Sequence, residues 1–406
     1  MKRSVSLVDL KGLNKNSVYN YIYREREASK QQIVQGLNMG LSTVSQNIRL
    51  LEDAGLIERS GSFGSTGGRK ADIIRIVRDA RIAIGVGILK KAVYIVAVDL
   101  YGEVLQSTMI DQAYECNTDY YTMLGASISD FVAQHGWQKA SVLGVSIATQ
   151  GTISADGESV DYGKIMNNYD MRLADFANHI PYPCRLEHDS KAAAYLELWN
   201  NPGVKDAVVL LLNRNFGGSL IIDRKIVKGS HMHAGAIEHL CISREGPLCY
   251  CGSRGCIETY CSANALEDAA GCSVKQFFEV LRRSRDVVGA QGAGEARGNK
   301  QTPVAGQSDD LNFEAIISEF ERIWEDYLDK LAFAIRNLSV IVDGSIIISG
   351  YLATYLTEED VDKLLAKVNM PPFPISRNQI IVGTFGQYAP AVGAALYYLD
   401  QFRKSV

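Results

Sequence analysis

From about residue 82 onwards, apolar segments of strand length alternate with segments of helical character. The stretch 81–107 predicts a three-stranded meander, and 141–153 predicts a buried strand that ends in a glycine turn. Further along, we expect a strand-turn-strand unit in 206–227, an apolar strand in 339–353 and a closing helix in 388–402. Strands that alternate with helices across two halves of a chain are typical of an α/β protein with a cleft between two lobes.

The composition is that of a folded globular protein, since 47% of the 406 residues are hydrophobic and 22% are charged. No apolar run approaches the roughly 20 residues that a membrane helix needs. The first residues, MKRSVSLVDLKGL, lack the apolar core of a signal peptide. We therefore expect a cytoplasmic protein with no membrane partner. In that reducing compartment the eight cysteines would not form a disulfide framework.

Charge is unevenly distributed along the chain. Residues 1–80 contain 13 Lys and Arg against 8 Asp and Glu, a balance of +5, so the net charge of −4 leaves −9 for the other residues. A basic segment joined to an acidic body suggests that the first part binds a polyanion. A solvated face with a few extra lysines explains the charge equally well, so the residue pattern has to decide between the two.

The first 80 residues carry the pattern of a helix-turn-helix unit. Residues 14–27 place apolar side chains at helical spacing, and Ser29 is expected to cap a short second helix. A tight turn at Gly40 follows, and Ser42 is expected to cap a third helix. Two helices joined by a short turn that contains glycine are typical of this DNA-binding unit.

The third predicted helix separates apolar from polar side chains. Its apolar face carries Val44, Ile48 and Leu51. The opposite face is expected to carry short polar groups, amides and a cation, which are the groups that read base edges and phosphates in a major groove. These residues are Thr43, Ser45, Gln46, Asn47 and Arg49.

A hairpin follows, with 56–59 paired to 72–77 and a Gly- and Ser-rich tip that bears Arg69 and Lys70. A cationic wing of this kind can enter the minor groove or bind phosphate. The alternative is a helical hairpin used for protein contacts. The whole order resembles the winged helix-turn-helix domain of bacterial transcription regulators. The residues expected to contact DNA are Ser42, Thr43, Ser45, Gln46, Arg49, Arg69 and Lys70.

A glycine-punctuated segment, 239–258, contains four candidate metal ligands: His239, Cys249, Cys251 and Cys256. Tetrahedral Zn²⁺ takes this donor set readily, and the glycines at 252 and 255 let the chain fold tightly around an ion. Redox chemistry would favour Cys-x-x-Cys, which is not the spacing here. The remaining alternative is a set of buried cysteines without a metal.

Residues 82–406 resemble the ROK family, which contains sugar kinases and sugar-responsive repressors on an actin-like ATPase fold. The matching landmarks are VAVDLYGEVL, GVSIATQG, LEHDSKAAA, HAGAIEH, CYCGSRGCIE and APAVGAA. With the front domain added, the resemblance points to the xylose-repressor-like branch of the family. It implies a winged helix-turn-helix domain in 1–80, a smaller lobe of 81–190 with 385–406, and a larger lobe of 191–384 that includes the zinc segment and a mobile insertion at 283–310.

The resemblance also implies roles for single residues. In this family the residues that match the four candidate ligands bind a structural zinc, and the match of Glu258 contacts the sugar. Asp189 matches the catalytic base of the kinases, and here we expect it to bind an effector hydroxyl, with no catalytic residue in the chain. The expected effector-binding residues are His188, Asp189, Glu238, His239 and Glu258.

Three loops that hold ATP in the kinases of this family are altered in this chain. The first hairpin reads Gly87-Ile88-Leu89-Lys90-Lys91 where the family has Asp followed by Gly-Gly-Thr, and the glycine-rich turns at 213–219 and 348–352 also differ. Without the Mg²⁺-binding carboxylate and close backbone approach, we expect no ATP binding and no enzymatic activity. The alternatives are a ROK sugar kinase with an accessory DNA-binding domain, and a constitutive repressor with a vestigial pocket.

The expected pocket departs from the family pattern as well. His188 and Lys191 replace two asparagines of the family pattern, and Ala236 replaces an acid. Glu238, two residues further on, could face the same way if the segment is extended. These changes favour an anionic sugar derivative as the effector. Against this, we expect Lys191 to point from a helix into solvent, which leaves a neutral sugar ahead. Two recognition helices on a palindromic operator require a homodimer or a dimer of dimers.

Overall fold

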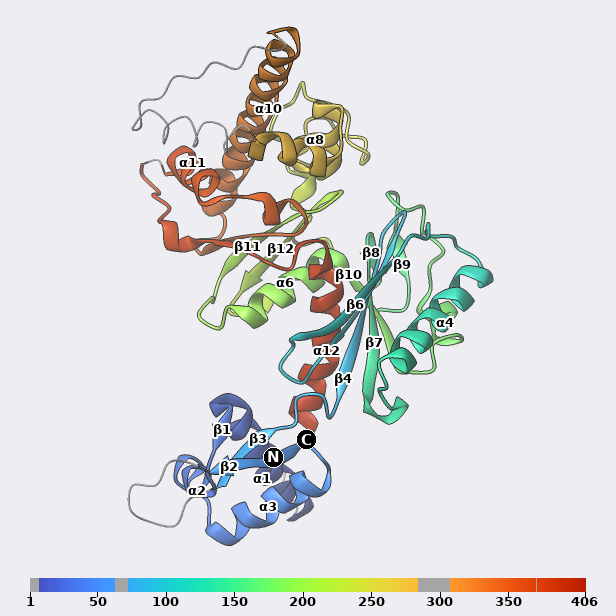
Figure 1. The fold of residues 1–406 in the computed structure, drawn as a ribbon, viewed down its shortest axis with the longest axis vertical. Helices are drawn as coiled ribbons and strands as arrows, with labels where there is room; N and C mark the ends of the chain where they lie inside the picture. Colours follow the sequence, from blue (N-terminus) through green and yellow to red (C-terminus); the bar gives the residue numbers. More distant parts are fainter. Residues whose placement is uncertain (1–6, 63–71, 284–306, 370) are drawn as a thin grey trace. The chain divides into compact units, whose positions relative to one another are not determined.

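The computed structural model describes residues 7–62, 72–283, 307–369 and 371–406 (Figure 1). Its contacts divide the chain into two compact units, Met1–His188 with Ala391–Val406, and Asp189–Pro390. These units do not separate residues 1–80 from the following segment, so the predicted three-part division stays a prediction. None of the described helices has the length and apolar character that a membrane span requires.

Three helices and a small antiparallel sheet begin the first unit. The helices are α1 (Leu7–Glu25), α2 (Lys30–Leu37) and α3 (Leu41–Asp53), and the sheet has the order β1-β3-β2 (Glu27–Ala28, Asp72–Ile76, Ile57–Ser62). The cap predicted at Ser29 is confirmed, because its hydroxyl accepts a hydrogen bond from the Gln32 N–H while the Gln32 side chain accepts one from the Ser29 N–H. The apolar residues expected inside the helices are buried: Val18, Ile22, Ile33, Val44, Ile48 and Leu51.

The tight turn predicted before α3 is present, but the predicted cap of this helix is not. Within the turn, Asn38 takes the left-handed conformation, with φ of 51°. Gly40 is the N-cap residue of α3, so Ser42 lies within the first turn and the prediction that it caps this helix is wrong. The physical reason is that asparagine also tolerates the left-handed region, which lets the chain turn two residues before the glycine.

The first unit continues with a five-stranded sheet. The predicted meander is confirmed as β4 (Ile82–Ile88), β5 (Val93–Val98) and β6 (Val104–Ile110), all antiparallel. Two strands, β7 (Val142–Thr149) and β10 (Cys184–His188), extend it in parallel, so that the order is β10-β7-β4-β5-β6. The unit also contains α4 (Thr118–Gln134), α5 (Leu173–Ala177), the turn η1 (Lys139–Ser141) and the hairpin of β8 (Thr152–Ile153) and β9 (Val160–Tyr162).

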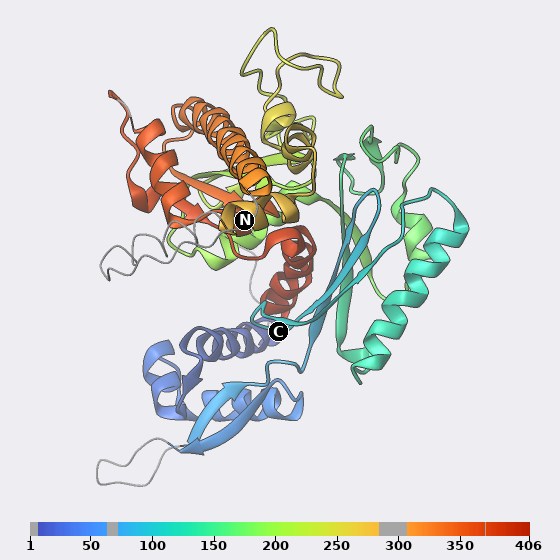
Figure 2. The ribbon, with the colours of Figure 1, turned by 45° about the horizontal axis from the view of Figure 1, so that its top comes forward.

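The two faces of β4 are covered by different helices. Ile84, Val86 and Ile88 belong to the core that includes side chains of α4 and α5. Gly85 and Gly87 face the other way, towards the predicted closing helix, which is α12 (Ala389–Ser405). A Cβ atom on Gly85 would lie 1.8 Å from the backbone oxygen of Ala391, so only glycine allows helix and strand to come this close. Figure 2 shows α12 running along this sheet to the N-terminal helices.

The second unit is a sheet between two helical layers. Its strand order is β13-β12-β11-β14-β15 (Lys225–Ile226, Phe216–Ile222, Ala207–Leu212, Ser345–Ser349, Ile380–Val382). One face packs on α6 (Asp189–Asn200) through a small cluster that includes Ala194 and Val209. The other face packs on α7 (Glu258–Cys261), α8 (Ala263–Ala270), helical residues 274–283, α10 (Gln307–Ser339) and α11 (Glu358–Val368). Short 3₁₀ turns complete the unit: η2 (Ile237–His239), η3 (Leu352–Tyr355), η4 (Arg377–Gln379) and η5 (Gly386–Tyr388).

Two predictions for the second unit need adjustment. The strand expected in 339–353 is only β14, because α10 continues to Ser339 and leaves the side chains of Val340 and Ile341 exposed. The predicted insertion at 283–310 lies mostly outside the described residues, and its last four positions, 307–310, belong to α10.

The close approach of α12 to β4 predicts unequal effects of two similar substitutions. Gly85→Ala should lower the free energy of unfolding of the first unit by about 2 kcal/mol or more. The added methyl group would overlap the backbone of Ala391, which cannot move aside as a flexible side chain could. Gly87→Ala is the matched control, since its Cβ would lie at an ordinary 3.5 Å from the Cβ of Ala391. Its effect should stay below about 1 kcal/mol. Urea denaturation monitored by circular dichroism measures both, and equal effects would contradict this packing.

Candidate functional site

The four predicted metal ligands come together in the second unit. The ligand atoms of His239, Cys249, Cys251 and Cys256 all lie within 4.8 Å of one another. Two of these approaches are 3.7 Å, between the sulfurs of Cys251 and Cys256, and 3.8 Å, between Cys249 Sγ and His239 Nδ1. Cys249 and Cys256 are buried, whereas the other two are partly exposed. This donor set and spacing suit a tetrahedral metal ion.

Glycines shape the loop that carries these sulfurs. Gly252 and Gly255 have φ of 95° and 67°, in the left-handed region that glycine adopts without strain. A Cβ on Gly255 would lie 1.5 Å from the Ser243 carbonyl oxygen, so no other residue fits there. The turn is closed by a hydrogen bond from the Gly252 N–H to the Cys249 carbonyl. The loop is therefore tight for the reason expected from the sequence.

Protonated thiols are favoured at two of these cysteines when no cation is bound. Burial raises the pKa of Cys256 to about 12, with a further contribution from the neighbouring thiols, and burial also raises the pKa of Cys249. A divalent cation at the centre of the cluster would favour the thiolate forms and offset this cost. The donors thus fit a metal such as zinc.

A fourth cysteine of the same segment was missed at the sequence level. Cys241 pairs with Cys256 through an isolated β-bridge, yet its sulfur donates to the Arg254 carbonyl at 3.4 Å. It is exposed and does not belong to the cluster of four candidate ligands. Cys261, which the sequence placed outside the metal pattern, is fully buried in the core.

Two acids lie next to the ligands in sequence and have raised pKa values. Burial raises the pKa of Glu258 to about 7, although its carboxylate accepts hydrogen bonds from Asn215 Nδ2 at 2.8 Å and from the Phe216 N–H at 2.6 Å. Burial raises the pKa of Glu238 to about 8, and the charges of Asp189 and Glu258 add to this. These mutual effects mean that the three carboxyl groups lie near one another within the second unit. The three acidic residues predicted to bind the effector, Asp189, Glu238 and Glu258, therefore lie near one another.

The segment that carries Glu238 is not extended, so the condition under which Glu238 was expected to face the same way as residue 236 is not met. Residues 237–239 form the 3₁₀ turn η2, with Ile237 buried against Gly218 of β12. A Cβ on Gly218 would lie 1.9 Å from Ile237 Cγ1, so the turn can pack closely on this strand. Glu238 reaches the other two acids from this turn rather than from an extended segment.

The prediction that Lys191 points into solvent is wrong. Lys191 is only 5% exposed, and its Nζ donates a hydrogen bond of 2.7 Å to the Met232 carbonyl. Its positive charge lowers the pKa of Glu238, which shows that the two side chains interact. The physical reason is that α6 is buried on most of its faces and offers this lysine both a carbonyl acceptor and a neighbouring acid.

Two other predicted effector residues lie at the chain junction of the units. His188 is the last residue of β10 and of the first unit, and its side chain is partly exposed. Asp189 begins α6 in the second unit, where its Oδ1 accepts a hydrogen bond from the Ser190 N–H. Asp189 is buried.

The structure places the three loops that the sequence predicts to differ from the ATP loops of the kinases. Lys90 and Lys91 are exposed at the turn between β4 and β5. In the second unit, the Tyr351 N–H donates to Asn213 Oδ1, which joins the turn 213–219 to the turn 348–352. Ser349 donates to the buried carboxyl group of Glu197 at 2.6 Å. Of these contacts, the Ser349 hydroxyl bond uses a side chain at a position where the resemblance predicts glycine, whereas Tyr351 contributes its backbone N–H.

The exposed face of α3 agrees with the sequence prediction in all but one residue. Ser42, Gln46 and Arg49 are exposed, and Thr43 and Ser45 are partly exposed. Asn47 is the exception, since it is 5% exposed and its Nδ2 donates to the Thr43 carbonyl. It lies one turn from Val44 and Leu51 and packs with them.

The predicted wing is a hairpin at its described end. Ile57 pairs with Ile76 and Glu58 with Arg75, and Arg59 joins Glu52 of α3 to Asp72 through ion pairs. Arg69 and Lys70 lie outside the described residues.

Known transcription regulators and sugar kinases are similar in sequence to this chain. The chain is 23% identical over 368 residues to the xylose repressor of Caldicellulosiruptor bescii, covering 90% of this chain and 89% of the relative. It is 26% identical over 278 residues to the transcriptional dual regulator NagC of Escherichia coli, covering 67% and 68%. Sugar kinases are also among the relatives.

One solved structure shares the fold over almost the whole chain. It is a ROK family transcriptional regulator, a homologue of the E. coli Mlc protein, with a TM-score of 0.64, 18% identity, and 96% of both chains covered. The sequence model of the ROK family matches residues 81–401 of this chain. With its mixed α/β, sugar-kinase-like body, this chain belongs to the ROK family.

Proposed function

We propose that this protein is a sugar-responsive transcriptional repressor that binds DNA through a winged helix-turn-helix domain. The observation that carries the proposal is α3, whose apolar residues are buried while Ser42, Gln46 and Arg49 project into solvent. A helix held in this way can enter a major groove with its polar face. The named repressor relatives support a regulatory role for the whole chain.

The proposed DNA contacts divide into two kinds. Ser42, Thr43, Ser45, Gln46 and Arg49 on α3 would contact base edges and nearby phosphates. Arg69 and Lys70 would contact phosphate or the minor groove from the wing. A homodimer would place two such helices on a palindromic operator, about one or two turns of DNA apart.

We propose zinc as the ion held by His239, Cys249, Cys251 and Cys256. Three thiolates and one imidazole form a closed tetrahedral shell that leaves no open position for catalysis. The ion would fix η2 and the start of α7, and thereby the carboxyl groups of Glu238 and Glu258 that adjoin two of its ligands. Its role would be structural.

The proposed effector is a neutral sugar or a close derivative. Asp189, Glu238 and Glu258 offer hydroxyl acceptors, and His188 and His239 offer ring nitrogens. Three neighbouring acids, of which Glu238 interacts with Lys191, favour a ligand without negative charge. Lys191, the residue that favoured an anionic effector, already donates to Met232. The neutral alternative therefore gains support from the position of this lysine.

The competing function is that of a ROK sugar kinase with an accessory DNA-binding domain. Phosphoryl transfer needs a bound metal and loops that hold the phosphates closely. Lys90 and Lys91 cannot supply a Mg²⁺ carboxylate. Ser349 and Tyr351 stand where the resemblance predicts glycine, and their hydroxyl groups bond to Glu197 and Tyr355. We therefore propose that the protein does not bind ATP productively.

The proposed DNA contacts predict two different mutational effects. Gln46→Ala or Arg49→Ala should relax base preference at one operator position, with a loss of about 1–3 kcal/mol on the preferred sequence. Arg69→Ala or Lys70→Ala should weaken binding to all sequences and reduce the salt slope by about 1. Fluorescence anisotropy with the protein's own promoter region measures both, and Lys91→Ala, an exposed lysine of the body, is the charge-matched control. Absence of salt-sensitive binding by the wild type would contradict the regulator proposal.

The proposed zinc shell predicts that cysteines of one segment behave differently. Cys256→Ser should lower the zinc content from about one ion per chain to less than about half, because a closed site loses one of its four ligands. It should also destabilise the second unit. Cys241→Ser, in the same loop but outside the cluster, should leave zinc content unchanged. Elemental analysis of protein prepared without chelator measures this, and a wild type without metal would overturn the assignment.

A further inference from the structure

The end of α12 is attached to α1 by polar contacts within the first unit. Asn16 Nδ2 donates to the Arg403 carbonyl at 2.7 Å, and Asn20 Nδ2 donates to the same oxygen at 3.3 Å. The rings of Tyr19 and Phe402 meet edge-on, with centroids 6.2 Å apart. The carbonyls in the last turn of a helix have no partner within the helix, so the two asparagines satisfy one of them. These contacts make one attachment point between the N-terminal helices and the body.

A second attachment lies at Arg26, between α1 and β1. Arg26 has φ of 67°, a left-handed conformation that is uncommon for a residue with a side chain. Its guanidinium carbon lies 3.8 Å from the centroid of the Tyr101 ring, in the turn between β5 and β6. The ring of Tyr23 lies 4.8 Å from that of Tyr101. The unusual backbone thus places a planar cation on an aromatic ring of the body.

A third attachment fixes the segment that leads from β3 to β4. Arg78 forms an ion pair of 2.7 Å with Asp99, whose side chain is fully buried. The other oxygen of Asp99 accepts hydrogen bonds from the Tyr101 N–H at 2.8 Å and from the Glu103 N–H at 3.0 Å. Asp99 therefore holds both the linker arginine and the turn that carries Tyr101.

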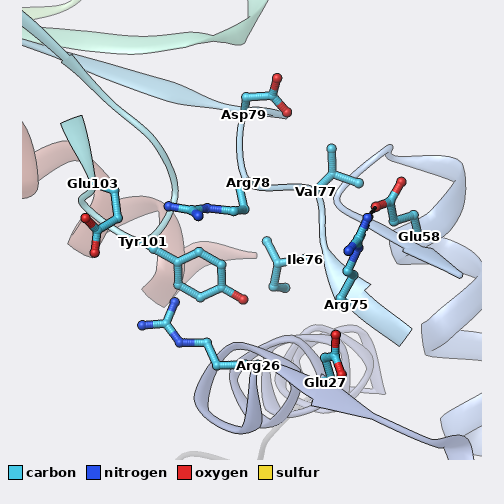
Figure 3. A pocket seen from close by; sticks show the side chains of 10 residues that line it. All are labelled: Arg26, Glu27, Glu58, Arg75, Ile76, Val77, Arg78, Asp79, Tyr101 and Glu103. Carbon is cyan, nitrogen blue, oxygen red and sulfur yellow. Dashed lines mark hydrogen bonds and ion pairs between the residues drawn. The ribbon is translucent and has the colours of Figure 1, made fainter. Parts of the chain in front are cut away.

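A cavity of about 680 Å³ lies beside these contacts. It is lined by residues of the N-terminal module, by which we mean the helices and small sheet of 7–62 and 72–76, by the linker after β3, and by Tyr101 and Glu103 of the body. Figure 3 shows the ring of Tyr101 at the edge of this cavity, between the side chains of Arg78 and Arg26. Charged side chains from both parts line it, among them Glu27, Arg75 and Glu103. Among the residues that line it, only Ile76 and Val77 are aliphatic, so directed contacts such as that of Arg26 with Tyr101 contribute to fixing the angle of the module.

We infer that Arg26, Tyr101 and Arg78 are positioning residues that fix the N-terminal helices on the body and thereby set the half-site spacing that the repressor accepts. We call these three residues the brace. The inference rests on the proposed DNA-binding function and goes beyond it, since the brace residues belong neither to α3 nor to the effector site. In a symmetric dimer a fixed module angle fixes the separation of the two α3 helices, whereas a loose module would accept several separations.

The test uses the full-length protein and a duplex selected by the wild type from random sequences. The centre of this duplex is then lengthened or shortened by one and by two base pairs. The wild type should lose affinity by about tenfold or more with each change, because a rigid pair of helices fits one spacing. Tyr101→Ala should lose about threefold or less on the same changes while its affinity for an isolated half-site stays unchanged.

Matched variants separate positioning from general damage. Tyr101→Phe keeps the ring under Arg26 and should restore strict spacing. Arg26→Lys keeps the charge but loses the planar stack, so it should relax spacing as Tyr101→Ala does. If Tyr101→Ala fails to fold, Arg26→Lys still tests whether loss of the contact relaxes the spacing. Arg24→Ala, at an exposed arginine of α1 that pairs with Glu25 and lies outside the brace, should behave as the wild type.

The outcomes distinguish the two claims. If Arg26→Lys and a folded Tyr101→Ala keep wild-type spacing, or if the wild type itself tolerates every spacer, the brace inference is wrong and DNA binding stands. If the wild type selects no duplex, the proposed function is wrong.

Discussion

The contact between α12 and β4 is the constraint on which the first unit depends. Gly85 brings the backbone of the helix against the strand, closer than any side chain would allow. The same helix then ends against α1, where Asn16 and Asn20 bond to its Arg403 carbonyl. One continuous helix therefore connects the central sheet of the first unit to the helices proposed to bind DNA. A helix is a stiff element, so the position of its end follows the sheet on which it packs.

The second unit depends on the cluster of His239 and three cysteines. The ligands come from η2 and from a loop whose glycines permit its tight course. Two acids, Glu238 and Glu258, adjoin these ligands in sequence, and their raised pKa values reflect burial near each other and near Asp189. An ion in the cluster would hold the acids at a separation that the chain alone does not fix. Residues 238–258 would then both hold the structural metal and contribute acids to effector binding.

Local patterns were sufficient to predict much of this structure, including the capped helix at Ser29, the meander of β4 to β6 and the four clustered ligands. The errors concern features that depend on distant residues or on choices between similar conformations. Lys191 is buried because Met232, 41 positions away, supplies an acceptor. Asn47 can be buried because its amide donates to the Thr43 carbonyl of its own helix. The N-cap of α3 is Gly40 rather than Ser42. The contact of Arg26 with Tyr101 has no periodic signal, since it joins a helix end to a remote turn.

The proposal that this protein is a sugar-responsive repressor is tested most directly by the effect of sugars on its affinity for DNA. Anisotropy of a labelled operator would be measured at fixed salt and zinc with neutral monosaccharides, N-acetylated sugars, sugar acids and sugar phosphates, while ATP consumption is followed in parallel. The account predicts that at least one neutral sugar weakens DNA binding by about tenfold or more, that Asp189→Asn abolishes this response, and that no sugar stimulates ATP turnover. DNA affinity that no member of the panel changes, or ATP turnover stimulated by a sugar, would contradict it.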